Sequence, residues 1–197
     1  MPNTTDGRCT LFHVMHEEVG GIRQGGMVQF PLKFQSGIMR GRFNPKDGQL
    51  YLCGLKGWQT SATREGGFYR VRYTGKPVRM PQTLHVARNG VEIGFTCTLD
   101  ETTAKDVGSY GVEQWNYQWT GNYGSPEFSV LNPEAKKHDV VDVRSVRLSS
   151  DKKTVFLDLG EVRPSDQMRI KLNLKAADGT TFTQEIYNTI YTAGPAK

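Results

Sequence analysis

The chain has 197 residues, of which 37% are hydrophobic and 23% are charged, and its formal net charge is +5. This composition excludes a disordered or fibrous protein, and the length suits one large domain or two small ones, of which we expect two. Lys and Arg alternate with apolar residues in "FYRVRY" and "MRIKLNLK", as on a solvated strand face, so we expect no nucleic-acid partner.

No stretch approaches the roughly 18 apolar residues that span a bilayer, and "MPNTTDGRC" lacks the order of a signal peptide. Cys9, Cys53 and Cys97 lie far apart, which excludes a CxxC metal knuckle and a CxxCH haem-attachment motif. Cys53 and Cys97 occur in apolar strand patterns, so we expect buried free thiols, although the spacing leaves one disulfide open.

The N-terminal stretch "HVMHEE" holds two imidazoles and a carboxylate, His13, His16 and Glu17. If this segment formed a turn, the three side chains could ligate Zn²⁺ or Cu²⁺. The spacing H-x-x-H-E differs from the H-E-x-x-H of metalloproteases, and an exposed, unliganded pair is the favoured interpretation. We therefore predict no metal site.

Residues 1–75 contain short strand patterns separated by glycines: "GGIRQGGMVQFPLKF", "SGIMRGRF", "NPKDGQLYLCGL" and "GGFYRVRYTG". "NPKDGQ" predicts a turn, with Pro45 early and Gly48 where φ is positive. We expect an antiparallel four-stranded sheet that resembles one propeller blade, which cannot bury both of its faces alone.

Between two of these strands, "KGWQTSATREGG" predicts a polar loop that holds Trp58 and Arg64. One interpretation is the rim of a ligand or electron-transfer face. The favoured one is a long turn whose Trp58 fills a gap between two domains. Residues 76–82, with two prolines in "KPVRMPQ", predict the linker.

Residues 83–197 predict an immunoglobulin-like β-sandwich. Asn89-Gly90 lies between two alternating runs and predicts a tight hairpin, while "DETTAKD" predicts one helical turn capped by Asp100. About seven short strands in all indicate a sandwich. His85 and His138 are expected to face solvent.

The stretch "QWNYQWTGNYGSPEF" contains four closely spaced aromatic residues: Trp115, Tyr117, Trp119 and Tyr123. In a strand, the first three would line one face, which suits either a buried wall or a sugar-stacking platform. Burial stabilises a fold by roughly 2 to 4 kcal/mol per ring, against about 1 kcal/mol for stacking on a sugar. We therefore expect a buried wall, with a carbohydrate surface that includes Asn122 as the alternative.

Catalytic motifs are missing. The acidic residues fall in turns or at strand ends, and the chain has no G-x-S-x-G elbow, phosphate-binding P-loop or dinucleotide fingerprint. We assign no catalytic residue.

Three long phrases resemble a known family: the run from "GGMVQFPLKF" to "GKPVRMP", then "GVEQWNYQWTGNYGSPEFSV" and "LKAADGTTFTQEIYNTIY". They are similar to the C-terminal part of large secreted bacterial proteins of planctomycetes and verrucomicrobia. In that family a propeller resembling pyrroloquinoline-quinone sugar dehydrogenases precedes an immunoglobulin-like domain, often with a cytochrome c module. The resemblance implies a periplasmic or extracellular location, and quinone or haem c only in a longer parent protein, not in this chain.

We expect a non-catalytic region that docks a partner or presents a substrate to such a propeller. The alternatives are part of a sugar or alcohol oxidoreductase and a carbohydrate-binding module. Expected partners are a polysaccharide or sugar, a propeller or cytochrome, or a second copy paired through a blade edge. The candidate ligand-binding residues are Trp58, Arg64, Trp115, Tyr117, Trp119, Asn122 and Tyr123.

Overall fold

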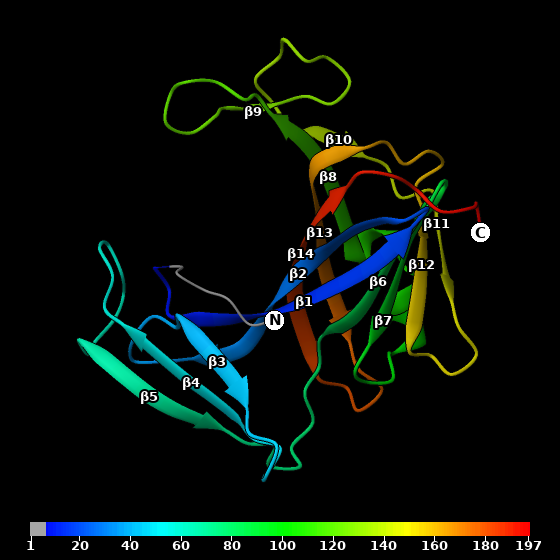
Figure 1. Ribbon diagram of the computed structural model, residues 1–197. Helices are drawn as coiled ribbons and strands as arrows, with labels where there is room; N and C mark the ends of the chain where they lie inside the picture. The colour runs from blue at the N-terminus through cyan, green and yellow to red at the C-terminus, as the bar shows by residue number, and fades with distance from the viewer. Residues whose placement is uncertain (1–6) are drawn as a thin grey trace. The chain divides into compact units, whose positions relative to one another are not determined.

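The computed structural model describes residues 7–197, and its regular secondary structure is almost entirely antiparallel strands, so the expected all-β class is confirmed (Figure 1). The strands are β1 (Thr10–Val19), β2 (Ile22–Lys33), β3 (Arg40–Phe43), β4 (Leu50–Leu55), β5 (Gly66–Val71), β6 (Pro81–Ala87), β7 (Gly90–Phe95), β8 (Tyr110–Tyr117), β9 (Glu127–Phe128), β10 (Asp139–Val141), β11 (Ser145–Leu148), β12 (Thr154–Asp158), β13 (Ser165–Lys175) and β14 (Thr181–Ile190). Two short helical segments, α1 (Glu101–Lys105) and η1 (Val107–Ser109), follow β7.

The chain divides into two compact units, residues 1–14 with 29–78 and residues 15–28 with 79–197. The division at 78/79 falls within the expected linker, 76–82. Residues 15–28, which we expected in the first domain, belong to the second unit. The physical reason is strand pairing, because Gly25–Val28 of β2 pairs with Ile186–Thr189 of β14.

The first unit contains a three-stranded sheet in the order β3-β4-β5. We expected four strands here, but β2, the first of the four predicted runs, pairs with β1 and β14 instead. The Gly48 turn is confirmed, with φ +67°. The core comprises Leu11, Ile38, Leu50 and Leu52, against which Phe30, Phe34, Tyr69 and Val71 pack.

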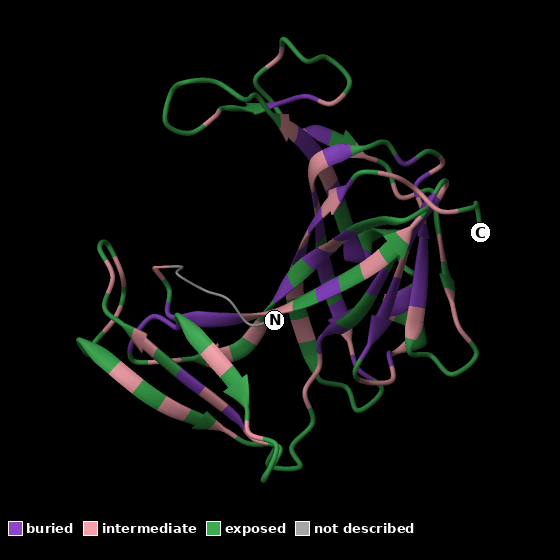
Figure 2. Ribbon diagram, viewed as in Figure 1, coloured by how far each residue is buried: buried purple, intermediate pink, exposed green. Residues whose placement is uncertain are grey.

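The second unit contains the two main sheets. One has the order β1-β2-β14-β13-β8-β10 with β9 beside β8, and the other has the order β11-β12-β7-β6. Their strands carry the most completely buried apolar residues, such as Ile93, Leu157 and Ile170 (Figure 2). Phe95 of β7 lies edge-on to Phe182 of β14, with ring centroids 6.2 Å apart, so the two sheets pack as a sandwich.

Two features of this unit, a hairpin and a helix cap, were expected from the residues next to them in the sequence. The expected hairpin joins β6 and β7, but its turn lies one position earlier than predicted, at Arg88 and Asn89, because Gly90 already pairs with Ala87 of β6. Asp100 caps α1, since its side chain accepts a hydrogen bond from Thr103 N at 3.0 Å. That bond lowers the pKa of Asp100, because it favours the charged carboxylate.

The cysteines are all unpaired thiols, but the expectation that Cys53 is buried is wrong. Cys53 pairs with Arg40 and Phe68 on neighbouring strands and lies on the exposed face of the three-stranded sheet. This sheet buries only one face, so alternate residues of β4 face solvent. Cys97 is partly buried, and burial raises the pKa of its thiol.

Candidate functional site

The aromatic stretch divides where β8 ends, at Tyr117. Trp115 is 4% exposed and Tyr117 is 43% exposed, whereas Trp119 and Tyr123 are 102% and 108% exposed. The expectation that the rings form one buried wall is therefore wrong, because the alternation stops with the strand. Beyond Tyr117 the chain leaves the sheet as a mostly exposed loop (Figure 2), which holds Trp119 and Tyr123.

We call residues 118–126 the aromatic loop. Its ends are tied together, since Gln118 N donates a hydrogen bond to Ser125 Oγ at 2.9 Å. Below that bond, Tyr117 of β8 pairs with Glu127 of β9. The Gln118 side chain also donates to Pro133 O at 3.3 Å, which links the loop to the next one. The loop is therefore anchored at its base while its two rings stand free.

Tyr123, but not Trp119, lines a depression of about 650 Å³. Its polar lining consists of Gln118, Thr120, Asn122, Ser125, Glu134 and Lys136, and Tyr123 is its exposed ring. Exposed aromatic faces beside amides and hydroxyls can stack on a flat apolar face of a ligand and hydrogen-bond its hydroxyl groups. Sugars present both kinds of group on one ring.

Trp115 instead belongs to a packed group that we call the His138 cluster: Glu113, Trp115, Glu127, His138 and Arg169. The imidazole of His138 stacks on Trp115, with centroids 4.0 Å apart and planes 8° from parallel. Its Nδ1 lies 3.1 Å from Glu113 Oε1 and its Nε2 lies 2.5 Å from Glu127 Oε2. Arg169 Nη2 lies 2.5 Å from the same Glu113 oxygen.

The cluster corrects the expectation that His138 is a solvent-facing loop residue, since its side chain is only 28% exposed. Burial disfavours the imidazolium, but the hydrogen bonds to Glu127 and Glu113 outweigh burial and raise the pKa of His138. Glu127 lies in β9, directly beyond the aromatic loop. The cluster thus joins β8, β9 and the segment before β10 at the base of that loop.

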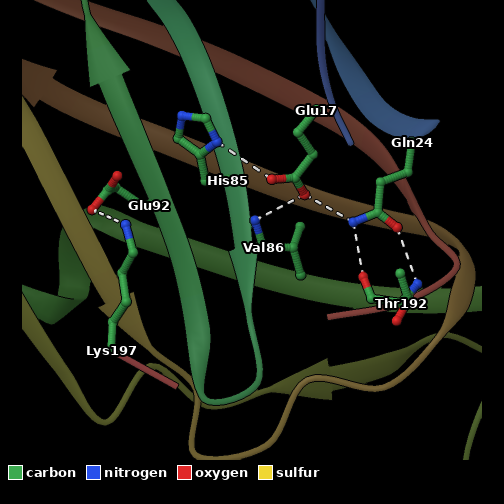
Figure 3. A network of polar contacts seen from close by, with 7 residues as sticks. All are labelled: Glu17, Gln24, His85, Val86, Glu92, Thr192 and Lys197. Carbon is green, nitrogen blue, oxygen red and sulfur yellow. Dashed lines mark hydrogen bonds and ion pairs between the residues drawn. The ribbon is translucent and has the colours of Figure 1, made fainter. Parts of the chain in front are cut away.

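Glu17, considered above with His13 and His16 as a metal ligand, has a structural role (Figure 3). Its carboxylate accepts hydrogen bonds from Gln24 Nε2 at 2.8 Å and from Val86 N at 3.1 Å, and its second oxygen lies 3.3 Å from His85 Nδ1. Gln24 in turn donates to Thr192 O at 2.8 Å. The network fastens the end of the β1–β2 hairpin to β6 and to the segment after β14, and His85 itself stays exposed, as expected.

The remaining predicted residues, Trp58 and Arg64, belong to the first unit. Trp58 is 89% exposed. The loop is held through its backbone, because Arg64 N donates to Gln35 O at 3.0 Å. Of the seven candidates, the structure brings Trp119, Asn122 and Tyr123 into one loop, whereas Tyr117 lies at its base and Trp115 lies in the His138 cluster.

Residues 7–197 contain no group of three or more His, Cys, Asp and Glu side chains arranged to hold a metal ion. Within the same residues, no helix is long and apolar enough to cross a membrane. Sequence reasoning missed Glu113, Glu127 and His138 as a group. They meet only through cross-strand pairing, for which no local signal exists.

Comparisons with protein-family models, with curated proteins and with solved structures gave no match to this chain.

Proposed function

We propose that this chain is a non-catalytic binding module that holds a carbohydrate on the aromatic loop. The observation that carries the proposal is the full exposure of Trp119 and Tyr123 on a loop whose base is anchored. Among the described residues the side-chain amide of Asn122, between them, makes no hydrogen bond, so it is available to ligand hydroxyls.

The cost of exposing these rings favours this assignment. Burying a ring of this size would stabilise the fold by roughly 2 to 4 kcal/mol. Trp119 and Tyr123 do not contribute this stabilisation, because both rings are exposed. Large exposed aromatic groups with polar neighbours are typical of surfaces that bind a partner. Stacking on a sugar would return about 1 kcal/mol per ring.

The family resemblance, which rests only on the three sequence phrases quoted above, implies a location and a partner for the chain. In that context the chain presents the carbohydrate to a propeller outside the cytoplasm, and an oxidoreductase of sugars or alcohols is the alternative role. Absorbance of bound quinone or haem in the purified protein would favour the alternative. Recovery of the natural protein from the periplasmic or extracellular fraction tests the location.

The direct test is retention on insoluble polysaccharides such as cellulose, chitin and xylan. We expect the protein to bind at least one of them, and Trp119→Ala and Tyr123→Ala to weaken binding about fivefold each, because each removes about 1 kcal/mol of stacking. The measurement is a depletion isotherm at increasing amounts of polysaccharide.

Trp58→Ala is the matched control, since it removes another largely exposed indole, which belongs to the other unit. It should bind as the unchanged protein does. Equal loss with Trp58→Ala would mean that any exposed ring contributes non-specifically. Failure to bind every polysaccharide and every soluble oligosaccharide tested would refute the proposal.

A further inference from the structure

An apolar groove of about 870 Å³ lies within the first unit, apart from the aromatic loop. One wall is Leu11, Phe12, His13 and Val14 of β1, and the other is Met39 together with Arg40–Phe43 of β3. Phe30 and Leu50 form the remainder of the lining. Val14 and Met39 are each 40% exposed and Phe43 is 69% exposed, so the groove leaves large apolar groups in contact with water.

Both walls are edge strands. β3 pairs only with β4 in its sheet, and β1 is the terminal strand of the larger sheet. An edge strand presents backbone N–H and C=O groups to a further strand. A groove of this kind therefore offers two things together: a backbone ladder along β3, and apolar space for every second side chain of an added strand.

Charge indicates what kind of strand would bind. The first unit holds ten Lys and Arg against three Asp and Glu, a net charge of +7, while the second unit holds fifteen against seventeen, a net charge of −2. Within residues 7–14 and 29–78, the one ion pair joins Lys56 to Glu65 at 3.3 Å. The basic residues of this unit are therefore largely uncompensated.

Two of them lie on the groove itself. Arg40 donates from Nη1 to Met39 O at 3.1 Å, and Arg42 donates from Nη1 to Gly41 O at 2.8 Å. Both guanidinium groups thus lie along the backbone of β3, and an incoming strand would release them from these carbonyl groups to pair with its carboxylates. The same charges oppose a symmetric dimer through this edge, because each copy would bring a net charge of +7 to the interface.

The geometry points to this groove as the docking site for an extended segment of another protein, in which apolar residues alternate with Asp or Glu. The segment adds a strand to β3, places its apolar side chains between β1 and β3, and pairs its carboxylates with Arg40 and Arg42. This site is independent of carbohydrate binding, so either proposal can fail without the other.

The test uses the full chain and a short fluorescein-labelled peptide in which Val alternates with Glu, read by fluorescence anisotropy. We expect it to bind at least about tenfold more tightly than the same peptide with Lys in place of Glu, and the affinity to fall as salt rises. Methylating the backbone nitrogens that face β3 should abolish binding, because it removes the ladder and keeps the side chains.

Arg40→Glu/Arg42→Glu should reverse the preference between the two peptides. Arg72→Glu/Lys76→Glu is the matched control, since it changes the charge of the same unit equally at exposed positions that do not line the groove. It should weaken binding only slightly. If the groove variant fails to fold, the methylated peptide and the salt dependence still decide the question.

Four results would overturn the proposal: no binding of the Val–Glu peptide, equal binding of both peptides, equal loss with both double variants, or tighter binding of single-stranded oligodeoxythymidine than of the peptide. Light scattering tests the remaining alternative. A dimer that Arg40→Glu/Arg42→Glu dissociates would make a second copy the occupant, and would also overturn it.

Discussion

At the scale of single residues, His138 connects the sheet of the second unit to the base of the aromatic loop. It stacks on Trp115 and bridges Glu113 and Glu127, and Arg169 shares the first carboxylate. A protonated imidazole forms ion pairs with both carboxylates, whereas a neutral one can donate only one hydrogen bond. The protonation state of His138 therefore decides how firmly β9 is held.

We predict that His138 titrates above its ordinary value of 6.5 in the folded protein, as the raised pKa requires. Its contribution to the free energy of unfolding is then fully present below pH 6.5 and is lost as the pH rises through the folded pKa. The measurement is an NMR titration of the imidazole Cε1–H, assigned with His138→Asn. Glu127→Gln should lower the pKa, and a midpoint at or below 6.5 in the unchanged protein would contradict the prediction.

At the scale of elements, the β1–β2 hairpin depends on one close approach. A Cβ on Gly25 would collide with the carbonyl oxygen of Met15 on the neighbouring strand, and Gly25 has φ +156°. Gly21, in the hairpin turn, also has a positive φ, +81°, but no atom lies within 4 Å of its Cβ position. Alanine substitutions at Gly25 and Gly21 therefore distinguish the destabilisation caused by a positive φ from the destabilisation caused by a steric collision.

We predict that Gly25→Ala destabilises the second unit more than Gly21→Ala does, by about 1 to 3 kcal/mol. The backbone of β1 cannot move away without disturbing Glu17, which is tied to β6 through Val86 N. Chemical denaturation followed by circular dichroism measures the difference. Equal costs for the two variants would show that the hairpin relaxes freely at Gly25.

At the scale of the whole molecule, charge is divided unevenly between the units. The first carries +7 and a core of few fully buried residues, while the second carries −2 and most of the buried apolar side chains. Like charges on a small unit destabilise its compact state, and salt screens that repulsion over about 10 Å at 0.1 M. The two units should therefore respond differently to ionic strength.

We predict that added salt slows hydrogen exchange in the first unit more than in the second. The amides to compare are those of Leu52 and Ile170, which are 1% and 0% exposed in their respective cores. Exchange at low and at moderate salt, read by NMR, gives the local free energy of opening at each site. An equal salt response at the two amides would contradict the prediction.

Much of the local structure could be predicted from residue patterns. The β6–β7 hairpin, the Gly48 turn and the Asp100 cap each depend on the chemistry of neighbouring residues. For the candidate site, the sequence predicted which residue types are present but not where each side chain lies in the fold. Period-two alternation placed Trp119 with Trp115, but nothing in the residues marks Tyr117 as the last position of the strand.

The sequence by itself determined the class of the protein: strands with a period of two, turns at glycines, and no catalytic motif. Only the tertiary structure decided that β2 pairs with β14, that His138 meets Trp115, and that Trp119 and Tyr123 face water. The reason is that turns and caps are satisfied by near neighbours. Strand register and ring burial depend on partners many residues away, whose position is fixed only when the sheets pack.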